Sequence, residues 1–118
     1  MPNLRRLALQ TMAGYYIATG LWPILHRRSF EAVTGPKTDF WLVQMVGLLA
    51  ATNGTAIAIG LRKRKIREST VALALLSAAS FAAIDVVHVA RKRISPIYLG
   101  DAVAEAMFAV AVLAAASD

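Results

Sequence analysis

The sequence predicts an all-α fold: one membrane domain over residues 1–118, built from four transmembrane helices that run up, down, up and down. Three observations lead to it. Hydrophobic residues make up 58% of the chain. They fall into four apolar blocks, each of roughly the 20 residues that cross a ~30 Å hydrocarbon core. Short polar stretches separate the blocks, so neighbouring helices should be antiparallel. The predicted helices are residues 7–25, 40–61, 69–90 and 96–116.

The first predicted helix, residues 7–25, is apolar apart from a few hydroxyl, phenol and amide side chains. Gly14 and Ala18 lie four residues apart, so they predict a smooth surface where a neighbouring helix packs closely. Pro23 lacks a backbone N–H and is expected to bend or end this helix.

The first connection, residues 26–39, is dense in charge for a short link between two helices. Ser29 is a suitable N-cap for a short amphipathic helix at the membrane surface. Gly35 and Pro36 should end that helix, because glycine adopts a left-handed C-cap and proline cannot continue the backbone hydrogen bonding.

The second predicted helix, residues 40–61, carries Asn53 near its middle, where we expect a hydrogen bond to another helix. The second connection, residues 62–68, reads RKRKIRE and is interpreted as a solvated turn on the cytoplasmic side. The third helix, residues 69–90, presents alanines at four-residue spacing, which predicts a close-packed stripe. They are Ala74, Ala78 and Ala82.

The fourth predicted helix, residues 96–116, begins with a recognisable start signal. Ser95 is a suitable N-cap, and Pro96 fits the first helical position because its missing N–H has no partner there anyway. Asp101 and Glu105 follow in the first turns of an otherwise apolar helix.

Net charge and composition indicate which classes of molecule this chain binds. The formal net charge is +6, but the basic residues stand in short clusters between apolar blocks and match no nucleic-acid recognition motif. This placement favours the lipid bilayer as partner and excludes nucleic acid. The dense run at residues 62–67 favours a cytoplasmic location of both termini. The chain has no cysteine, which excludes disulfides and thiolate sites.

Ionisable residues inside a membrane are costly and usually functional. Asp85 and His88 are three residues apart, and Asp101 and Glu105 four apart, so each pair shares one helix face. Chain direction brings both pairs to one end of the molecule, together with His26. We therefore expect one polar cluster there. The candidate binding residues at this end are His26, Arg27, Glu31, Lys37, Asp39, Asp85, His88, Arg91, Asp101 and Glu105.

Three functions are compatible with such a cluster. The first is binding or transport of a small molecule or a proton, with a homodimer as a possible form because four helices make a thin pathway. The second is a membrane enzyme with a His/carboxylate site, since these ligands suit zinc, iron or manganese. The third is a structural or interaction subunit, in which the acidic groups are merely paired. No motif specifies a cofactor or a catalytic residue. The metal-ligand candidates are Asp85, His88, Asp101 and Glu105.

Two parts of the sequence carry a resemblance. The runs GLWP, HRRSFE and TGPKTD, and later ISPIYLGDA followed by Glu105, look like uncharacterised small bacterial membrane proteins. In the hydropathy plan of the whole chain, the protein also resembles the DoxX-like group of four-helix membrane proteins. The resemblance implies a four-helix bundle in a bacterial inner membrane, and it implies no activity.

Overall fold

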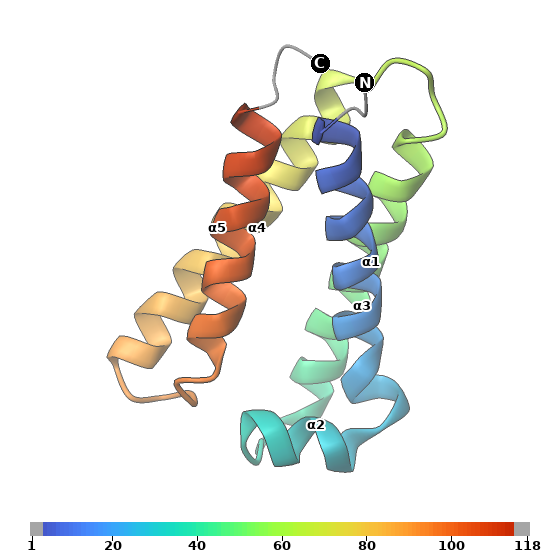
Figure 1. Ribbon diagram of the computed structural model, residues 1–118. Coiled ribbons are helices and arrows are strands. Elements are labelled where there is room, and N and C mark those ends of the chain that lie inside the picture. The colour runs from blue at the N-terminus through green and yellow to red at the C-terminus, as the bar shows by residue number, and fades with distance from the viewer. Residues whose placement is uncertain (1–3, 115–118) are drawn as a thin grey trace.

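The computed structural model describes residues 4–114, and within that range the chain forms five α-helices and no β-strand. The predicted all-α class is therefore confirmed. The four long helices coincide with the four predicted segments, and the starts of α1, α4 and α5 differ from prediction by one to three residues. The predicted start at Pro96 is wrong: α5 begins at Tyr98, and Oγ of Ser95 accepts from the backbone N–H of Ile97 in a turn before it. The predicted last residue, Ala116, lies outside the described range. The helices are α1 (Leu4–Leu25), α2 (Arg27–Thr34), α3 (Phe40–Gly60), α4 (Glu68–Ala90) and α5 (Tyr98–Ala114) (Figure 1).

The one short helix, α2, is the helix expected in the first connection, but its N-cap residue differs from the prediction. His26, not Ser29, is the N-cap residue, and its Nδ1 accepts a hydrogen bond from the backbone N–H of Ser29 at 3.2 Å. Gly35 ends the helix with φ 97°, a conformation that side-chain-bearing residues rarely adopt.

Two helices of the described range, α3 and α4, are long and apolar enough to cross a membrane. The prediction of four spanning helices is met by these two only. α5 has 17 described residues, fewer than the ~20 that a span requires. α1 is long enough, but Arg5, Arg6 and its other polar side chains lower its mean hydropathy.

The surface of α3 and α4 supports membrane association. Only 28% of the apolar window of each helix is buried inside the molecule. Leu48, Leu49 and Leu76 are among the large apolar side chains left more than half exposed. Large apolar side chains exposed in this number along two helices favour contact with another apolar phase or molecule, and a lipid bilayer provides one.

The long helices form two antiparallel pairs, α1 with α3 and α4 with α5 (Figure 1). The two pairs lie together at the end where α1 begins and α5 ends, and they separate toward α2. A buried cluster holds the closed end. It consists of Leu9, Met12, Ala13, Tyr16, Ile57, Ala74, Ala78 and Val112.

Glycines allow α1 and α3 to touch backbone to backbone. A Cβ on Gly20 would collide with the carbonyl oxygen of Gly47, and a Cβ on Gly54 would lie 2.7 Å from the carbonyl oxygen of Ala13. The prediction that Gly14 and Ala18 form this contact is wrong, because both are exposed and nothing lies within 4 Å of a Cβ on Gly14.

A polar contact joins α3 of one pair to α4 of the other. Asn53 of α3 donates a hydrogen bond from Nδ2 to Oγ of Ser77 on α4 at 3.0 Å. The predicted hydrogen bond between Asn53 and another helix is thereby confirmed. Ala74 and Ala78 of the predicted alanine stripe are buried in the same region, and Ala82 is half-buried.

Candidate functional site

Three acidic side chains from the α4–α5 pair meet inside the molecule. Asp85 lies late on α4, and Asp101 and Glu105 lie early on α5, so the antiparallel pairing brings them to the same level. Asp101 interacts with the carboxyl groups of both Asp85 and Glu105. Asp85 is 6% exposed and Glu105 is 1% exposed. We call these three residues the carboxyl triad.

Two consecutive tyrosines of α1 bind the carboxyl triad. The hydroxyl of Tyr15 donates to Oδ1 of Asp101 at 2.5 Å, and the hydroxyl of Tyr16 donates to Oε1 of Glu105 at 2.6 Å. Because consecutive residues of a helix point about 100° apart, two neighbouring side chains can reach along one flank of the same partner helix. These two bonds tie the α1–α3 pair to the α4–α5 pair.

Aromatic contacts hold the tyrosine rings in place. The ring of Tyr16 packs edge-on against Phe81 of α4, with centroids 5.4 Å apart, and the ring of Tyr15 packs against Phe108 of α5 at 5.5 Å. Sequence reasoning missed both tyrosines as site residues. The available signal was a pair of phenol groups in the middle of an apolar helix, where a buried hydroxyl needs a partner.

Asp85 differs from the other two members of the triad. Its Oδ2 is buried and has no hydrogen-bond partner within residues 4–114, although buried polar atoms are nearly always paired. This side chain lines a cavity of about 350 Å³ between the two helix pairs. The lining is mostly apolar or aromatic and includes the whole triad, with no basic side chain. The lining residues are Tyr16, Thr19, Gly20, Pro23, Phe30, Leu42, Val43, Val46, Gly47, Ala50, Phe81, Ile84, Asp85, Ile94, Tyr98, Asp101 and Glu105.

The structure does not bring the two histidines to the triad. His26 is exposed, and its Nδ1 lies 2.6 Å from Oγ of Ser29 at the start of α2. His88 is half-buried on α4, with no side-chain hydrogen bond or ion pair to any described residue. Arg91 and Asp39 are exposed, and Asp39 makes no side-chain capping bond to α3. The predicted single cluster is therefore two separate groups.

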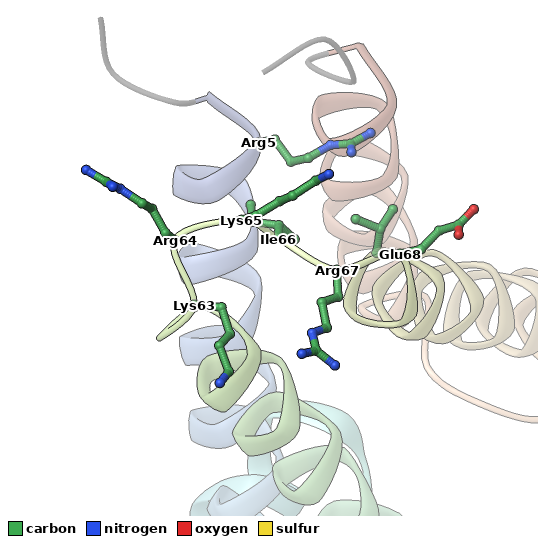
Figure 2. A pocket seen from close by; sticks show the side chains of 8 residues that line it. Arg5, Lys63, Arg64, Lys65, Ile66, Arg67 and Glu68 are labelled. Carbon is green, nitrogen blue, oxygen red and sulfur yellow. The ribbon is translucent and has the colours of Figure 1, made fainter.

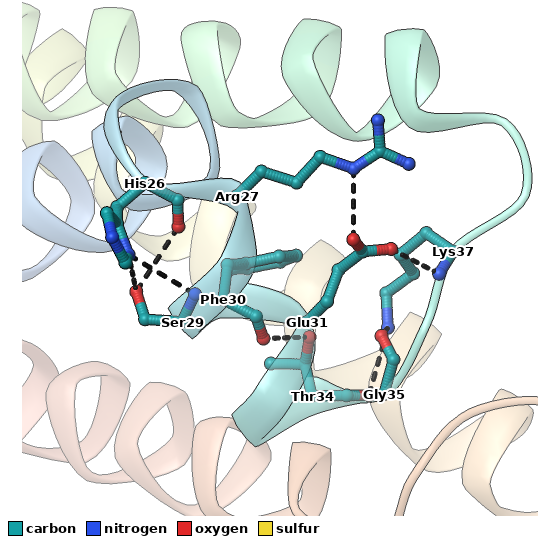
Figure 3. Close-up of polar contacts among 8 residues, drawn as sticks. All are labelled: His26, Arg27, Ser29, Phe30, Glu31, Thr34, Gly35 and Lys37. Atoms are coloured by element: carbon teal, nitrogen blue, oxygen red, sulfur yellow. Dashed lines mark hydrogen bonds and ion pairs between the residues drawn. The ribbon is translucent and has the colours of Figure 1, made fainter.

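The second group surrounds Glu31 on α2 (Figure 3). Nε of Arg27 donates to Oε1 of Glu31 at 2.9 Å, and the backbone N–H of Lys37 donates to Oε2 at 2.7 Å. Nζ of Lys37 donates to the carbonyl oxygens of Thr34 and Gly35, both at 2.9 Å. These bonds fold the connection back on α2.

Cation–π contacts extend this group toward neighbouring helices. The guanidinium of Arg27 lies 4.0 Å from the ring centre of Phe40 at the start of α3. Nζ of Lys37 lies 5.3 Å from the ring centre of Tyr98 at the start of α5. Tyr98 also lines the cavity, so Lys37 stands beside the cavity without entering it.

Glu31 allows a prediction about pH. The backbone N–H of Lys37, and then the guanidinium of Arg27, hold the pKa of the Glu31 carboxyl below its ordinary value of 4.5. A lowered folded-state pKa stabilises the fold above the unfolded value, and that stabilisation disappears as pH falls through the folded pKa. We expect the wild type to unfold at a higher temperature than Glu31→Gln at pH 7. The difference should shrink below about pH 4.5.

The measurement is thermal unfolding in detergent micelles from pH 7 to pH 3. Asp39→Asn removes an acidic group that makes no capping bond, so it is the matched control. A difference between wild type and Glu31→Gln that is constant across this range would contradict the assignment.

The predicted metal ligands do not assemble. Residues 4–114 contain no group of three histidine, cysteine, aspartate or glutamate side chains arranged to hold a metal ion. The triad supplies only carboxyl oxygens, and the imidazole of His88 makes no contact with it that would complete a mixed nitrogen and oxygen site. The geometry therefore gives the metalloenzyme hypothesis no support.

Comparison with known proteins identifies no relative. No protein-family model, no curated protein and no solved structure matches this chain. The resemblance to the DoxX-like group thus stays a prediction.

Proposed function

We propose that the chain is a four-span membrane protein whose cavity binds a small, largely apolar organic cation. The observation that carries this proposal is the position of Asp85: its side chain lines a mostly apolar cavity, and its buried Oδ2 has no hydrogen-bond partner among residues 4–114. An ionised carboxyl group in such surroundings is strongly unfavourable without a cation beside it.

The lining supports a cation over other ligands. Its only ionisable acidic groups are the carboxyl triad, and it includes no lysine, arginine or histidine. It includes four aromatic residues, Tyr16, Phe30, Phe81 and Tyr98, a residue type that attracts organic cations. A cavity of about 350 Å³ is at the small end of ligand sites, which span ~300–1,000 Å³.

The four-span arrangement is part of the proposal. α1 packs along α3, and α5 packs along α4, so a membrane crossed by α3 and α4 would also enclose their partners. Arg5, Arg6 and the basic connection at residues 62–67 then lie at one end, which favours a cytoplasmic location for it. A bacterial inner membrane is the corresponding location.

Asp85→Asn tests this function. The substitution keeps the side-chain size and removes the charge, so we expect affinity for the cation to fall at least about tenfold, corresponding to ~1.4 kcal/mol. We also expect a higher unfolding temperature, because the variant no longer buries a third carboxyl group beside two others. A structural role for Asp85 predicts the reverse change in stability.

The probe is benzyltrimethylammonium, with neopentylbenzene as its uncharged analogue of the same shape. Calorimetric titration into the protein in micelles should detect binding of the cation and weaker binding of the neutral analogue. Asp39→Asn should change the affinity for the cation little, because it removes an acidic group outside the cavity lining. Equal binding of the cation to wild type and Asp85→Asn would refute the proposal.

A further inference from the structure

The basic connection between α3 and α4 borders a second hollow, at the opposite end of the molecule from α2. This hollow has a volume of about 910 Å³, and Figure 2 shows the side chains around it. Five of its eight lining residues are basic and one is acidic. The lining residues are Arg5, Lys63, Arg64, Lys65, Ile66, Arg67, Glu68 and Val71. We propose that it binds the headgroup of an acidic phospholipid that carries two phosphate groups.

Hydrogen bonds to α1 fix the backbone of the connection. The guanidinium of Arg6 donates to the carbonyl oxygen of Leu61, and also to those of Lys63 at 2.8 Å and Arg64 at 2.9 Å. Nε of Arg5 donates to the carbonyl oxygen of Val112 on α5 at 3.0 Å. A charged loop held in this way is a preorganised surface, unlike a freely moving turn.

The basic side chains themselves are not neutralised. Within residues 4–114, no acidic side chain pairs with Lys63, Lys65 or Arg67, and all three are exposed. Figure 2 shows Lys63 and Arg67 projecting to one side of the connection and Lys65 projecting in the same direction as Arg5. Arg64 projects away from these four side chains. The other four cations thus lie in two groups around the hollow, which suits two phosphate groups better than one.

The position along the helices favours a lipid over a soluble phosphate. The connection joins Gly60, the end of one candidate span, to Glu68, the start of the other, so it lies at the depth of the headgroups if these helices cross the bilayer. Ile66 and Val71 add an apolar part to the lining, where the glycerol and first methylenes of a lipid can lie. Basic residues next to a span bind anionic lipid through such charge pairing.

The test compares two triple variants that lose the same charge. Lys63→Gln, Lys65→Gln and Arg67→Gln remove three cations of the hollow. Arg91→Gln, Lys92→Gln and Arg93→Gln remove three exposed cations from the connection between α4 and α5. Binding is measured by native mass spectrometry of the protein in nonionic micelles, so the result does not depend on membrane orientation. The probes are diphosphatidylglycerol, phosphatidylcholine with the same acyl chains, and inorganic pyrophosphate.

We expect wild type to bind diphosphatidylglycerol in preference to phosphatidylcholine. The first triple variant should lose roughly a hundredfold in affinity, whereas the second should stay within about twofold of wild type. Equal losses in the two variants, or no loss in the first, would overturn the proposal. Pyrophosphate that binds as tightly as the lipid, with the same sensitivity to the first variant, would overturn it in favour of a soluble phosphate ligand.

Folding is checked separately from binding. The helical circular dichroism and unfolding temperature of the first variant should match those of wild type, because its three side chains are exposed and make no hydrogen bond to a described residue. If that variant fails to fold, the single substitution Lys65→Gln takes its place. It should lower lipid affinity about fivefold, and unchanged affinity would refute the site.

Discussion

Gly20→Ala should destabilise the protein, whereas the same substitution at Gly14, on the same helix, should not. A Cβ at position 20 would collide with the backbone carbonyl of Gly47, lie 2.8 Å from the backbone nitrogen of Ala51 and lie 3.2 Å from Cβ of Ala50. Backbone atoms cannot rotate away, so α1 and α3 must move apart. We expect a loss of about 1–3 kcal/mol in the free energy of unfolding, as for an overpacked core.

Gly14→Ala is the matched control. A Cβ there meets nothing within 4 Å, and alanine is the better helix former by about 0.8–1 kcal/mol. The two alanine variants should therefore shift the unfolding midpoint in opposite directions when helicity is followed in micelles against temperature or denaturant. Equal shifts would show that Gly20 and Gly47 do not make a tight contact in solution.

Hydropathy and turn signals predicted the four long helices, because each apolar block is bounded by residues that cap or interrupt a helix. The packing face of α1 was not predictable in the same way. Gly14 and Gly20 both lie in the same mostly apolar helix, and only the partner helix decides which one is buried. Only two of the four predicted spans have the length and hydropathy of a membrane span within the described residues, because α1 carries Arg5 and Arg6 near its start and α5 has 17 described residues.

The carboxyl triad followed from the sequence through helical spacing and chain direction. Asp85 must face a neighbour on α5 if those helices pair, and the pairing is forced by a short connection. The histidines could not be placed in this way. His26 follows the last residue of α1, where the chain turns to start α2, so its side chain caps the N-terminus of α2. Tyr15 and Tyr16 were missed because a hydroxyl in a helix has many possible partners.

Tyr16→Phe is expected to be the most damaging change at the site. It removes one oxygen and leaves the ring packed against Phe81, but Glu105, at 1% exposure, loses the hydroxyl that donates to it at 2.6 Å. A buried polar group without its partner costs about 1–3 kcal/mol, and more if it is charged. Tyr15→Phe makes the same chemical change beside Asp101, which is only half-buried. Water can replace the lost donor there, so the cost should be smaller, about 0.5–1.5 kcal/mol.

A double variant separates the lost hydrogen bond from any general damage to the core. Glu105→Leu removes the carboxyl group that Tyr16→Phe leaves without its donor, and replacing both partners by apolar groups of similar shape is often nearly neutral. Tyr16→Phe combined with Glu105→Leu should therefore be more stable than Tyr16→Phe alone in the same unfolding measurement. If the two substitutions instead add, with no coupling between them, then the Tyr16–Glu105 bond does not stabilise the fold, and the link between the two helix pairs must come from apolar packing.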